Sequence, residues 1–194
     1  MIIIDIIYSI GQRRLIKQGY LQNAQIILSP NCDDRPDGEQ ISLLVIHNIS
    51  LPPKQFGGQF IDDLFLNRLD IKQHTYFESI AHLRVSSHVL IERNGSLKQF
   101  VSFYKRAWHA GISCYQGQDC CNDFSIGIEL EGSDEIAYTL EQYQCLAMVV
   151  KEIIKKHPLI KNNIVGHSDI APGRKTDPGK AFDWAYFKQQ LDLA

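Results

Sequence analysis

The stretch 41–46, ISLLVI, is apolar at every position except Ser42, and it runs directly into His47. A short apolar run of this kind is typical of a strand that is buried on both faces of a sheet. Such a strand must be covered by other elements, so the chain has to surround it with further strands and with helices. The run also delivers a histidine to the end of a central strand.

The remaining sequence predicts the elements that complete this sheet. Asn94-Gly95 is a strong hairpin turn. Thr139 and Gln142 have the spacing of a capping box, and apolar residues then recur every three or four positions up to His157. We predict strands over 85–92, 97–101, 124–130 and 163–166, and helices over 139–157 and 183–191. The predicted fold class is α/β, with a single mixed β-sheet flanked by α-helices.

The stretch 50–78 shows little periodicity. It contains Pro52-Pro53 and Gly57-Gly58, and only 61–65 has the pattern of a short helical turn. Long irregular stretches inside a compact domain are often the walls or lids of active sites. We therefore expect this stretch to border the functional site.

Charge and composition exclude several kinds of partner. The net charge of −2 gives no basic face for nucleic acid and no strong attraction to anionic lipid. The apolar start of the chain is interrupted by Asp5, and Arg13-Arg14 follow it rather than precede it, so it is a poor secretory signal and too short for a membrane span. We expect a cytoplasmic protein with no nucleic-acid or membrane partner, and a monomer, because nothing in the sequence demands a dimer.

The five cysteines are an odd number, and Cys120 and Cys121 are adjacent. Adjacent cysteines are awkward for an ordinary disulfide, and none of the five has the spacing of a metal site. Reduced thiols are therefore expected.

The segment 166–179, GHSDIAPGRKTDPG, places a histidine, a basic pair and an aspartate among helix breakers. Prolines and glycines on both sides of Arg174-Lys175 forbid a helix there, so we predict irregular backbone. His167 and Asp177 in this segment join His47 from the predicted strand end. Two histidines and one carboxylate from separate elements are the ligand set of a catalytic zinc with one position left for water.

Several longer motifs resemble a known family. The chain is similar to the zinc-dependent N-acetylmuramoyl-L-alanine amidases of type two, which share a fold with peptidoglycan-recognition proteins. Within that family it is most similar to the cytosolic 1,6-anhydro-N-acetylmuramyl-L-alanine amidases. The matching segments are 42–53, 56–58, 81–88, 105–111, 121–132 and 166–184. They imply a zinc amidase domain over 19–194 and an N-terminal extension, 1–18, outside the match.

The resemblance implies a set of catalytic residues. One zinc ion per chain would be held by His47, His167 and Asp177, and three protein ligands allow zinc to lower the pKa of a bound water toward about 7. Glu129 would act as the general base, with Glu131 as the weaker alternative. Lys175, two residues before Asp177, would stabilise the negative charge that develops on the carbonyl oxygen.

Residues for substrate binding are predicted around this centre. Arg84 and Arg174 are candidates for the carboxylates of the peptide, although a salt bridge at a strand edge explains Arg84 almost as well. Trp108 offers an apolar face to a sugar ring, and a buried core position is an equal alternative. Asn48 follows a ligand and can present its amide, and Tyr76 belongs to the irregular stretch.

The other histidines are predicted to have different roles. His82 and His88 flank a strand and are expected to be structural or to line the substrate site, and His157 lies at a helix end. The resemblance places His109 near the sugar. We expect no second metal site.

The implied reaction is hydrolysis of the lactyl amide between 1,6-anhydro-N-acetylmuramic acid and L-alanine in small soluble muropeptides, a step of cell-wall recycling. Two alternatives remain at this stage. An exported amidase that cuts intact peptidoglycan would share the metal site, and a recognition protein would keep the groove while losing a ligand. The filled ligand positions disfavour the recognition protein.

Overall fold

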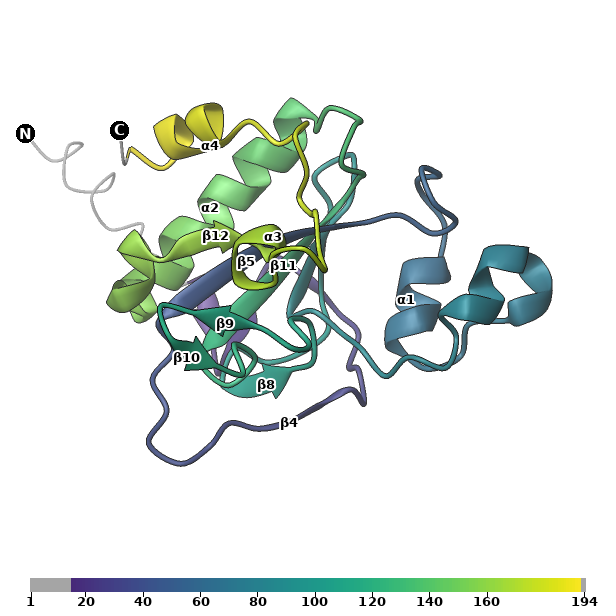
Figure 1. The fold of residues 1–194 in the computed structure, drawn as a ribbon. Helices are drawn as coiled ribbons and strands as arrows, with labels where there is room; N and C mark the ends of the chain where they lie inside the picture. Colours follow the sequence, from purple (N-terminus) through teal and green to yellow (C-terminus); the bar gives the residue numbers. More distant parts are fainter. Residues whose placement is uncertain (1–14, 193–194) are drawn as a thin grey trace, which may run out of the picture.

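The computed structural model describes residues 15–192. Its centre is a six-stranded sheet in the order β12-β5-β11-β6-β7-β3 (Figure 1). The strands are β3 (Gln25–Ile26), β5 (Leu43–Ile49), β6 (Val89–Ile91), β7 (Leu97–Gln99), β11 (Ser125–Glu131) and β12 (Ile164–Gly166). All neighbouring pairs are parallel except β6 with β7. The predicted mixed sheet is confirmed, with the apolar strand β5 inside it.

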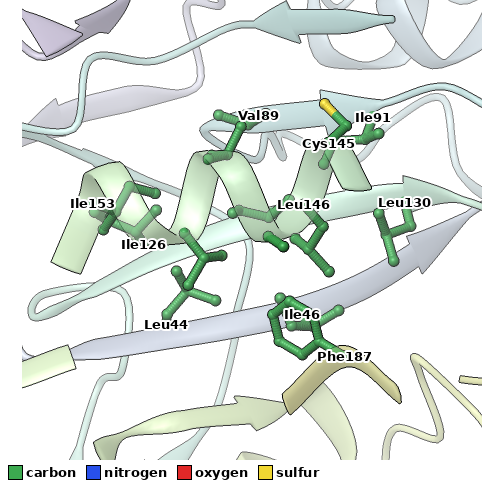
Figure 2. Packing of buried hydrophobic residues seen from close by; sticks show 14 of the residues in the cluster. Leu44, Ile46, Val89, Ile91, Ile126, Leu130, Cys145, Leu146, Ile153 and Phe187 are labelled. Atoms are coloured by element: carbon green, nitrogen blue, oxygen red, sulfur yellow. The ribbon is translucent and has the colours of Figure 1, made fainter. Parts of the chain in front are cut away.

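Helices cover one face of the sheet. They are α2 (Leu140–Lys156) and α4 (Trp184–Gln190). Figure 2 shows Leu146 and Ile153 of α2 over Leu44 and Ile46 of β5 and Ile126 and Leu130 of β11, with Phe187 of α4 beside them. This cluster is the largest part of the core.

Shorter elements and loops complete the fold around the sheet. Two-stranded pairs are formed by β1 (Ile16–Lys17) with β2 (Tyr20–Leu21), β4 (Cys32–Asp34) with β8 (Lys105–Ala107), and β9 (Cys114–Tyr115) with β10 (Gln118–Asp119). The short helices are α1 (Phe60–Phe65), α3 (His167–Ile170) and three 3₁₀ helices, η1 (Ile71–Gln73), η2 (Thr75–Ser79) and η3 (Pro158–Asn162). The apolar residues of α1 and η2 form a second core cluster with Leu90 and Phe100.

Several predicted boundaries need correction. The strand predicted over 85–92 is only Val89–Ile91, because the amide of Ser86 donates to the carbonyl oxygen of Trp108, outside the sheet, and Glu92 already belongs to the turn that leads into β7. The segment around His167 was predicted to be irregular, but His167–Ile170 forms one helical turn before Pro172 and Gly173 end it. The stretch 50–78 contains α1 as predicted, and also η1 and η2.

Three further expectations concern the cysteines, the N-terminal extension and membrane-spanning helices. All five cysteines are free thiols, as predicted. Most of the predicted extension 1–18 lies outside the described residues, so its boundary stays a prediction, although Ile16 is buried in the main core. Within residues 15–192, no helix is both long enough and apolar enough to cross a membrane.

Candidate metal centre and active site

The C-terminal ends of two adjacent parallel strands place two functional side chains on one face of the sheet. His47 on β5 is paired in register with Glu129 on β11. Alternation along each strand then directs both side chains to the same side. His47 is 1% exposed although it lies near the strand end, because the loops after the strands close over it.

A tight turn brings the other two candidate ligands to this edge. β12 lies beside β5 and passes directly into α3, whose first residue is His167. The chain then reverses, and the amide of Ser168 donates to the carbonyl oxygen of Asp177 at 3.0 Å. The approach is close enough that a Cβ on Gly166 would lie 2.7 Å from Cδ of Pro178. The glycine therefore allows Asp177 to return to the start of α3.

Three potential ligand atoms converge at this point. Nδ1 of His47 is 2.9 Å from Nδ1 of His167 and 3.0 Å from Oδ2 of Asp177, and Nδ1 of His167 is 3.1 Å from the same oxygen. Nε2 of His167 lies 3.0 Å from the carbonyl oxygen of Ala110, which can only accept, so this nitrogen carries the proton and Nδ1 is bare in the neutral ring. Two imidazole nitrogens and a carboxylate oxygen thus share one space with at most one proton among them. This donor set fits a divalent metal.

Electrostatics keep these groups in the forms that bind a metal. Burial lowers the pKa of His47 to about 4, with a further contribution from His167, so its ring is neutral at pH 7. Burial acts to raise the pKa of Asp177, but the close contacts of its carboxylate with the rings of His167 and His47 outweigh it and hold this pKa well below the usual range. Metal ligands must be deprotonated, and His47 and Asp177 meet that condition.

The carboxyl group of Glu129 is buried away from solvent. Its Oε2 is buried, and no hydrogen-bond partner for it is found among the described residues. Burial raises the pKa of Glu129 well above its ordinary value, and the nearby negative charge of Asp177 adds to this effect, while Lys175 opposes it. A buried carboxyl group without a partner is costly and is typical of a site that handles protons.

A cavity of about 370 Å³ opens above these residues. Both predicted catalytic residues and all three predicted ligands line it, as do three of the predicted substrate-binding residues: His47, Asn48, Tyr76, Trp108, Glu129, His167, Lys175 and Asp177. Trp108 is partly exposed at the wall and donates to Asp33 at 3.2 Å, and the amide of Asn48 donates to Asp134 at 2.8 Å. The stretch 50–78 contributes Leu51, Leu64 and Tyr76 to the wall.

Two predicted substrate-binding residues lie elsewhere. Arg84 is exposed, and its guanidinium donates to the carbonyl oxygens of its neighbours in sequence, Ala81, His82 and Leu83. Arg174 donates to the carbonyl oxygens of Ala110 and Ile112. The structure does not bring either guanidinium into the cavity, because each is engaged by backbone acceptors.

Sequence reasoning missed one contact of the centre. Nδ1 of His109 is 2.9 Å from Nε2 of His47, the nitrogen that faces away from the other ligands. The resemblance predicted that His109, beside Trp108, lies near the sugar. The sequence also contained one indication of its contact with the strand that was not used. Gly127 lies on the face of β11 that otherwise carries Ser125, Glu129 and Glu131, and a Cβ at that position would lie 2.4 Å from Cγ of His109.

Comparisons with known proteins identify similar amidases. The sequence profile of the family described as N-acetylmuramoyl-L-alanine amidase matches residues 37–180. The 1,6-anhydro-N-acetylmuramyl-L-alanine amidases AmpD of Citrobacter freundii and of Escherichia coli K12 are each 59% identical over 174 residues, which is 90% of this chain and 93% and 95% of those proteins.

Solved structures give the same result. A crystal structure of a Se-Met AmpD derivative is 57% identical, has a TM-score of 0.90, and is matched over 91% of this chain and 98% of that chain. The E. coli amidase AmiD, solved in complex with the substrate anhydro-N-acetylmuramic acid-L-Ala-D-gamma-Glu-L-Lys, is 32% identical with a TM-score of 0.56, over 80% of this chain and 60% of that chain. An endolysin amidase of Clostridium intestinale is 15% identical with a TM-score of 0.62, which is a likeness of fold alone.

Proposed function

The chain belongs to the N-acetylmuramoyl-L-alanine amidase family, and we propose that it hydrolyses the lactyl amide between 1,6-anhydro-N-acetylmuramic acid and L-alanine in small soluble muropeptides. The observation that carries the proposal is the convergence of His47, His167 and Asp177 at the floor of a cavity that also contains the unpartnered carboxyl oxygen of Glu129. The relatives named for this amide bond match the chain along nearly its whole length.

We propose one zinc ion per chain, held by Nδ1 of His47, Nδ1 of His167 and Oδ2 of Asp177. Bound there, zinc would polarise the amide carbonyl group and lower the pKa of a coordinated water. The three ligands come from two strand ends and a tight turn, so their positions are fixed by the sheet before any metal binds.

Glu129 is proposed as the group that moves protons. Glu129 lines the cavity, its buried Oε2 has no hydrogen-bond partner among the described residues, and its raised pKa favours uptake of a proton. Glu129 accepts a proton from the attacking water and later gives it to the amine of L-alanine as that amine leaves. An ordinary exposed carboxylate would hold the proton too weakly for the second step.

Lys175 is proposed to stabilise charge on the substrate. Its side chain lines the same cavity as Glu129 and the three ligands. As water attacks, negative charge develops on the carbonyl oxygen, and an ammonium group already in place lowers the energy of that state. Trp108 and Tyr76 offer aromatic surface to the anhydro-sugar, and Asn48 in the same cavity lining offers polar contacts. Peptide contacts by Arg84 and Arg174 stay a prediction that requires both guanidinium groups to leave their backbone acceptors.

We further propose that the protein acts as a monomer in the cytoplasm, where soluble muropeptides are recycled. The cavity is built by one chain, so catalysis needs no second subunit. A net charge of −2 fits a small soluble substrate better than a polyanionic one.

The test offers the zinc-loaded protein two substrates, a purified anhydro-muropeptide and polymeric sacculi, with and without a chelator. Release of the free peptide is measured by liquid chromatography with mass spectrometry. We expect cleavage of the soluble fragment, loss of cleavage with chelator and recovery on adding zinc. Activity that is insensitive to the chelator would refute the metal mechanism. Faster release from sacculi than from the soluble fragment would instead favour a wall-lytic amidase.

A further inference from the structure

The nitrogen of His47 that faces away from the ligand cluster has a specific partner. Nε2 of His47 lies 2.9 Å from Nδ1 of His109, and the two rings meet edge to face at 83° with their centroids 5.0 Å apart. On its other side, Nε2 of His109 lies 3.0 Å from Oγ of Ser125. The three groups form a hydrogen-bonded chain that leads from the candidate metal ligand to β11.

The neighbouring residue has the corresponding role for the second histidine ligand. The carbonyl oxygen of Ala110 accepts from Nε2 of His167 at 3.0 Å. Residues 109 and 110 therefore contact the outer nitrogens of both histidine ligands, one through a side chain and one through the backbone. The amide oxygen of Asn122 holds this segment in place, since it accepts from the amides of His109 at 3.1 Å and of Ala110 at 2.8 Å.

The strand beneath is shaped to seat the ring of His109. A Cβ on Gly127 would lie 2.4 Å from Cγ and 2.5 Å from Nδ1 of His109, so only glycine leaves room for the imidazole there. Ser125, Gly127 and Glu129 alternate along β11 and share one face of the strand. The face that carries the proposed general base thus also carries the seat and the anchor of His109.

The proton positions follow from these contacts. For Nδ1 of His47 to bind a metal, its proton must reside on Nε2. Nε2–H of His47 then donates to Nδ1 of His109, and Nε2–H of His109 donates to the hydroxyl oxygen of Ser125. Each imidazole nitrogen then acts once, as a donor, an acceptor or a metal ligand. The hydrogen-bonded chain therefore needs no additional proton.

We infer that His109 is a positioning residue, which holds His47 in the ring orientation and tautomer that present a bare Nδ1 to the metal, and that Gly127 and Ser125 are required to seat it. The inference rests on the proposed zinc centre, and it adds a residue that the ligand set alone does not reveal. Loss of such an outer partner of a histidine ligand typically costs about 10–100-fold in metal affinity or activity.

The experiment measures zinc affinity of the full chain by competition with a fluorescent chelator. The variants are His109→Ala, His109→Asn, Gly127→Ala and the double variant His109→Ala with Gly127→Ala. Asparagine keeps an acceptor oxygen near the position of Nδ1, whereas alanine keeps none. His157→Gln, which removes a histidine at the end of α2, is the matched control. Thermal unfolding of each metal-free variant establishes that it is folded.

We expect His109→Ala to bind zinc about 10–100-fold more weakly than the wild type, and His109→Asn to recover most of that loss. Gly127→Ala should also weaken binding, but should cost nothing further in the His109→Ala background, because its effect passes through the displaced ring. In the zinc-loaded wild type, the ¹⁵N shifts of His47 should report a protonated Nε2.

Failure of the proposed metal centre and failure of the inference about His109 give different results. A wild-type chain that binds no zinc refutes the proposed metal centre and this inference with it. A wild type that binds zinc tightly while His109→Ala binds equally well overturns the inference alone. Additive losses from Gly127→Ala and His109→Ala would show that the glycine is needed for another reason and would remove the proposed seat. If His109→Ala does not fold, the asparagine and Gly127→Ala variants still decide the outcome.

Discussion

Two glutamates that are two residues apart on β11 have opposite surroundings. Glu129 faces the cavity with an unpartnered oxygen, whereas Glu131 is 4% exposed and accepts from the amides of Gly57 and Arg93. The resemblance favoured Glu129, but strand alternation directs both side chains to the same side of the sheet. Position along the strand therefore could not distinguish the two glutamates. The contacts separate them, because a carboxylate that anchors two backbone amides is not free to exchange protons with a substrate.

This difference predicts the result of a matched pair of substitutions. Glu129→Gln keeps the size of the side chain but removes its ability to take up a proton, so kcat should fall by about 10²–10⁴-fold. Zinc content should stay at one per chain, because Glu129 is not a ligand. Glu131→Gln should retain most of the turnover. Both are checked by steady-state kinetics with metal analysis, and unchanged kcat in Glu129→Gln would assign the base to another group.

A second histidine beneath the site predicts a pH effect on stability. The amide of Gly127 donates to Nδ1 of His88 at 3.1 Å, so the ring is neutral with its proton on Nε2, which donates to the carbonyl oxygen of Lys105. Burial lowers the pKa of His88 to about 3, and the charge of Arg35 adds to this. Between about pH 6.5 and 3 the unfolded chain therefore binds one more proton at this residue than the folded chain does.

The stability of the metal-free protein should accordingly fall as the pH is lowered below about 6.5, by up to about 1.4 kcal/mol per pH unit from this residue. Urea unfolding at pH 7, 6 and 5 in the presence of a chelator gives the slope. His88→Gln should reduce the slope by about one proton, whatever its effect on absolute stability. An equal slope in the variant would mean that His88 is not buried in its neutral form.

The convergence of the three candidate ligands could be predicted at this scale, and their outer partners could not. His47, His167 and Asp177 are ligand-type residues at the ends of segments whose pattern is visible in the sequence. The contact of His109 with His47 joins residues 62 apart, and no local pattern encodes it. For Arg84 and Arg174 the prediction relied on charge alone. A guanidinium group favours a carboxylate partner, but in the structure both side chains donate to backbone carbonyl oxygens.

At the scale of elements, the start of α2 shows how one cap ties a helix to the sheet. Oγ1 of Thr139 accepts from the amide of Gln142 at 3.1 Å, and the side chain of Gln142 returns to the amide of Thr139. The same hydroxyl donates to the carbonyl oxygen of Arg93 at 2.7 Å, and the side-chain amide of Gln142 donates to the backbone carbonyl oxygen of Glu131 at 2.9 Å. The predicted capping box is present, and its links to the sheet go beyond the motif.

Thr139→Ala should therefore lower the free energy of unfolding by about 1–2 kcal/mol, the upper part of the usual range for a cap. Thr139→Ser keeps the hydroxyl and should recover most of the loss. Denaturant midpoints of the three proteins at one pH measure the effect. A loss in the serine variant as large as in alanine would indicate that packing of the methyl group, not the cap, is responsible.

Long periodic elements could be predicted, whereas the shortest ones could not. The helix from Leu140 and the strand through His47 have patterns that extend over many residues. The residues before Val89 alternate as a strand would, but the amide of Ser86 donates to the carbonyl oxygen of Trp108, which lies outside the six-stranded sheet. The turn His167–Ile170 is stabilised by Asp169, whose carboxylate accepts from the amide of Gly166 at 2.7 Å, a local contact that the surrounding breakers obscured.

At the scale of the whole molecule, the proposed zinc links parts of the chain that are far apart in sequence. His47 lies near the end of β5, His167 begins α3, and Asp177 closes the turn that follows it. The strand β5 supplies Leu44 and Ile46 to the main core cluster, so a ligand that joins these segments should stabilise the fold as a unit. A metal that binds the folded state and not the unfolded state adds RT ln(1 + [L]/Kd) to the free energy of unfolding.

Zinc should therefore raise the unfolding temperature in a concentration-dependent way, and free zinc at a thousandfold excess over Kd should add about 4 kcal/mol of stability. A chelator should remove this increment without unfolding the protein at room temperature, because the large apolar core under α2 is complete without the metal. Asp177→Ala removes one ligand, so its unfolding temperature should not respond to zinc. Differential scanning calorimetry over a zinc titration tests both proteins, and an equal response in Asp177→Ala would place the metal elsewhere in the molecule.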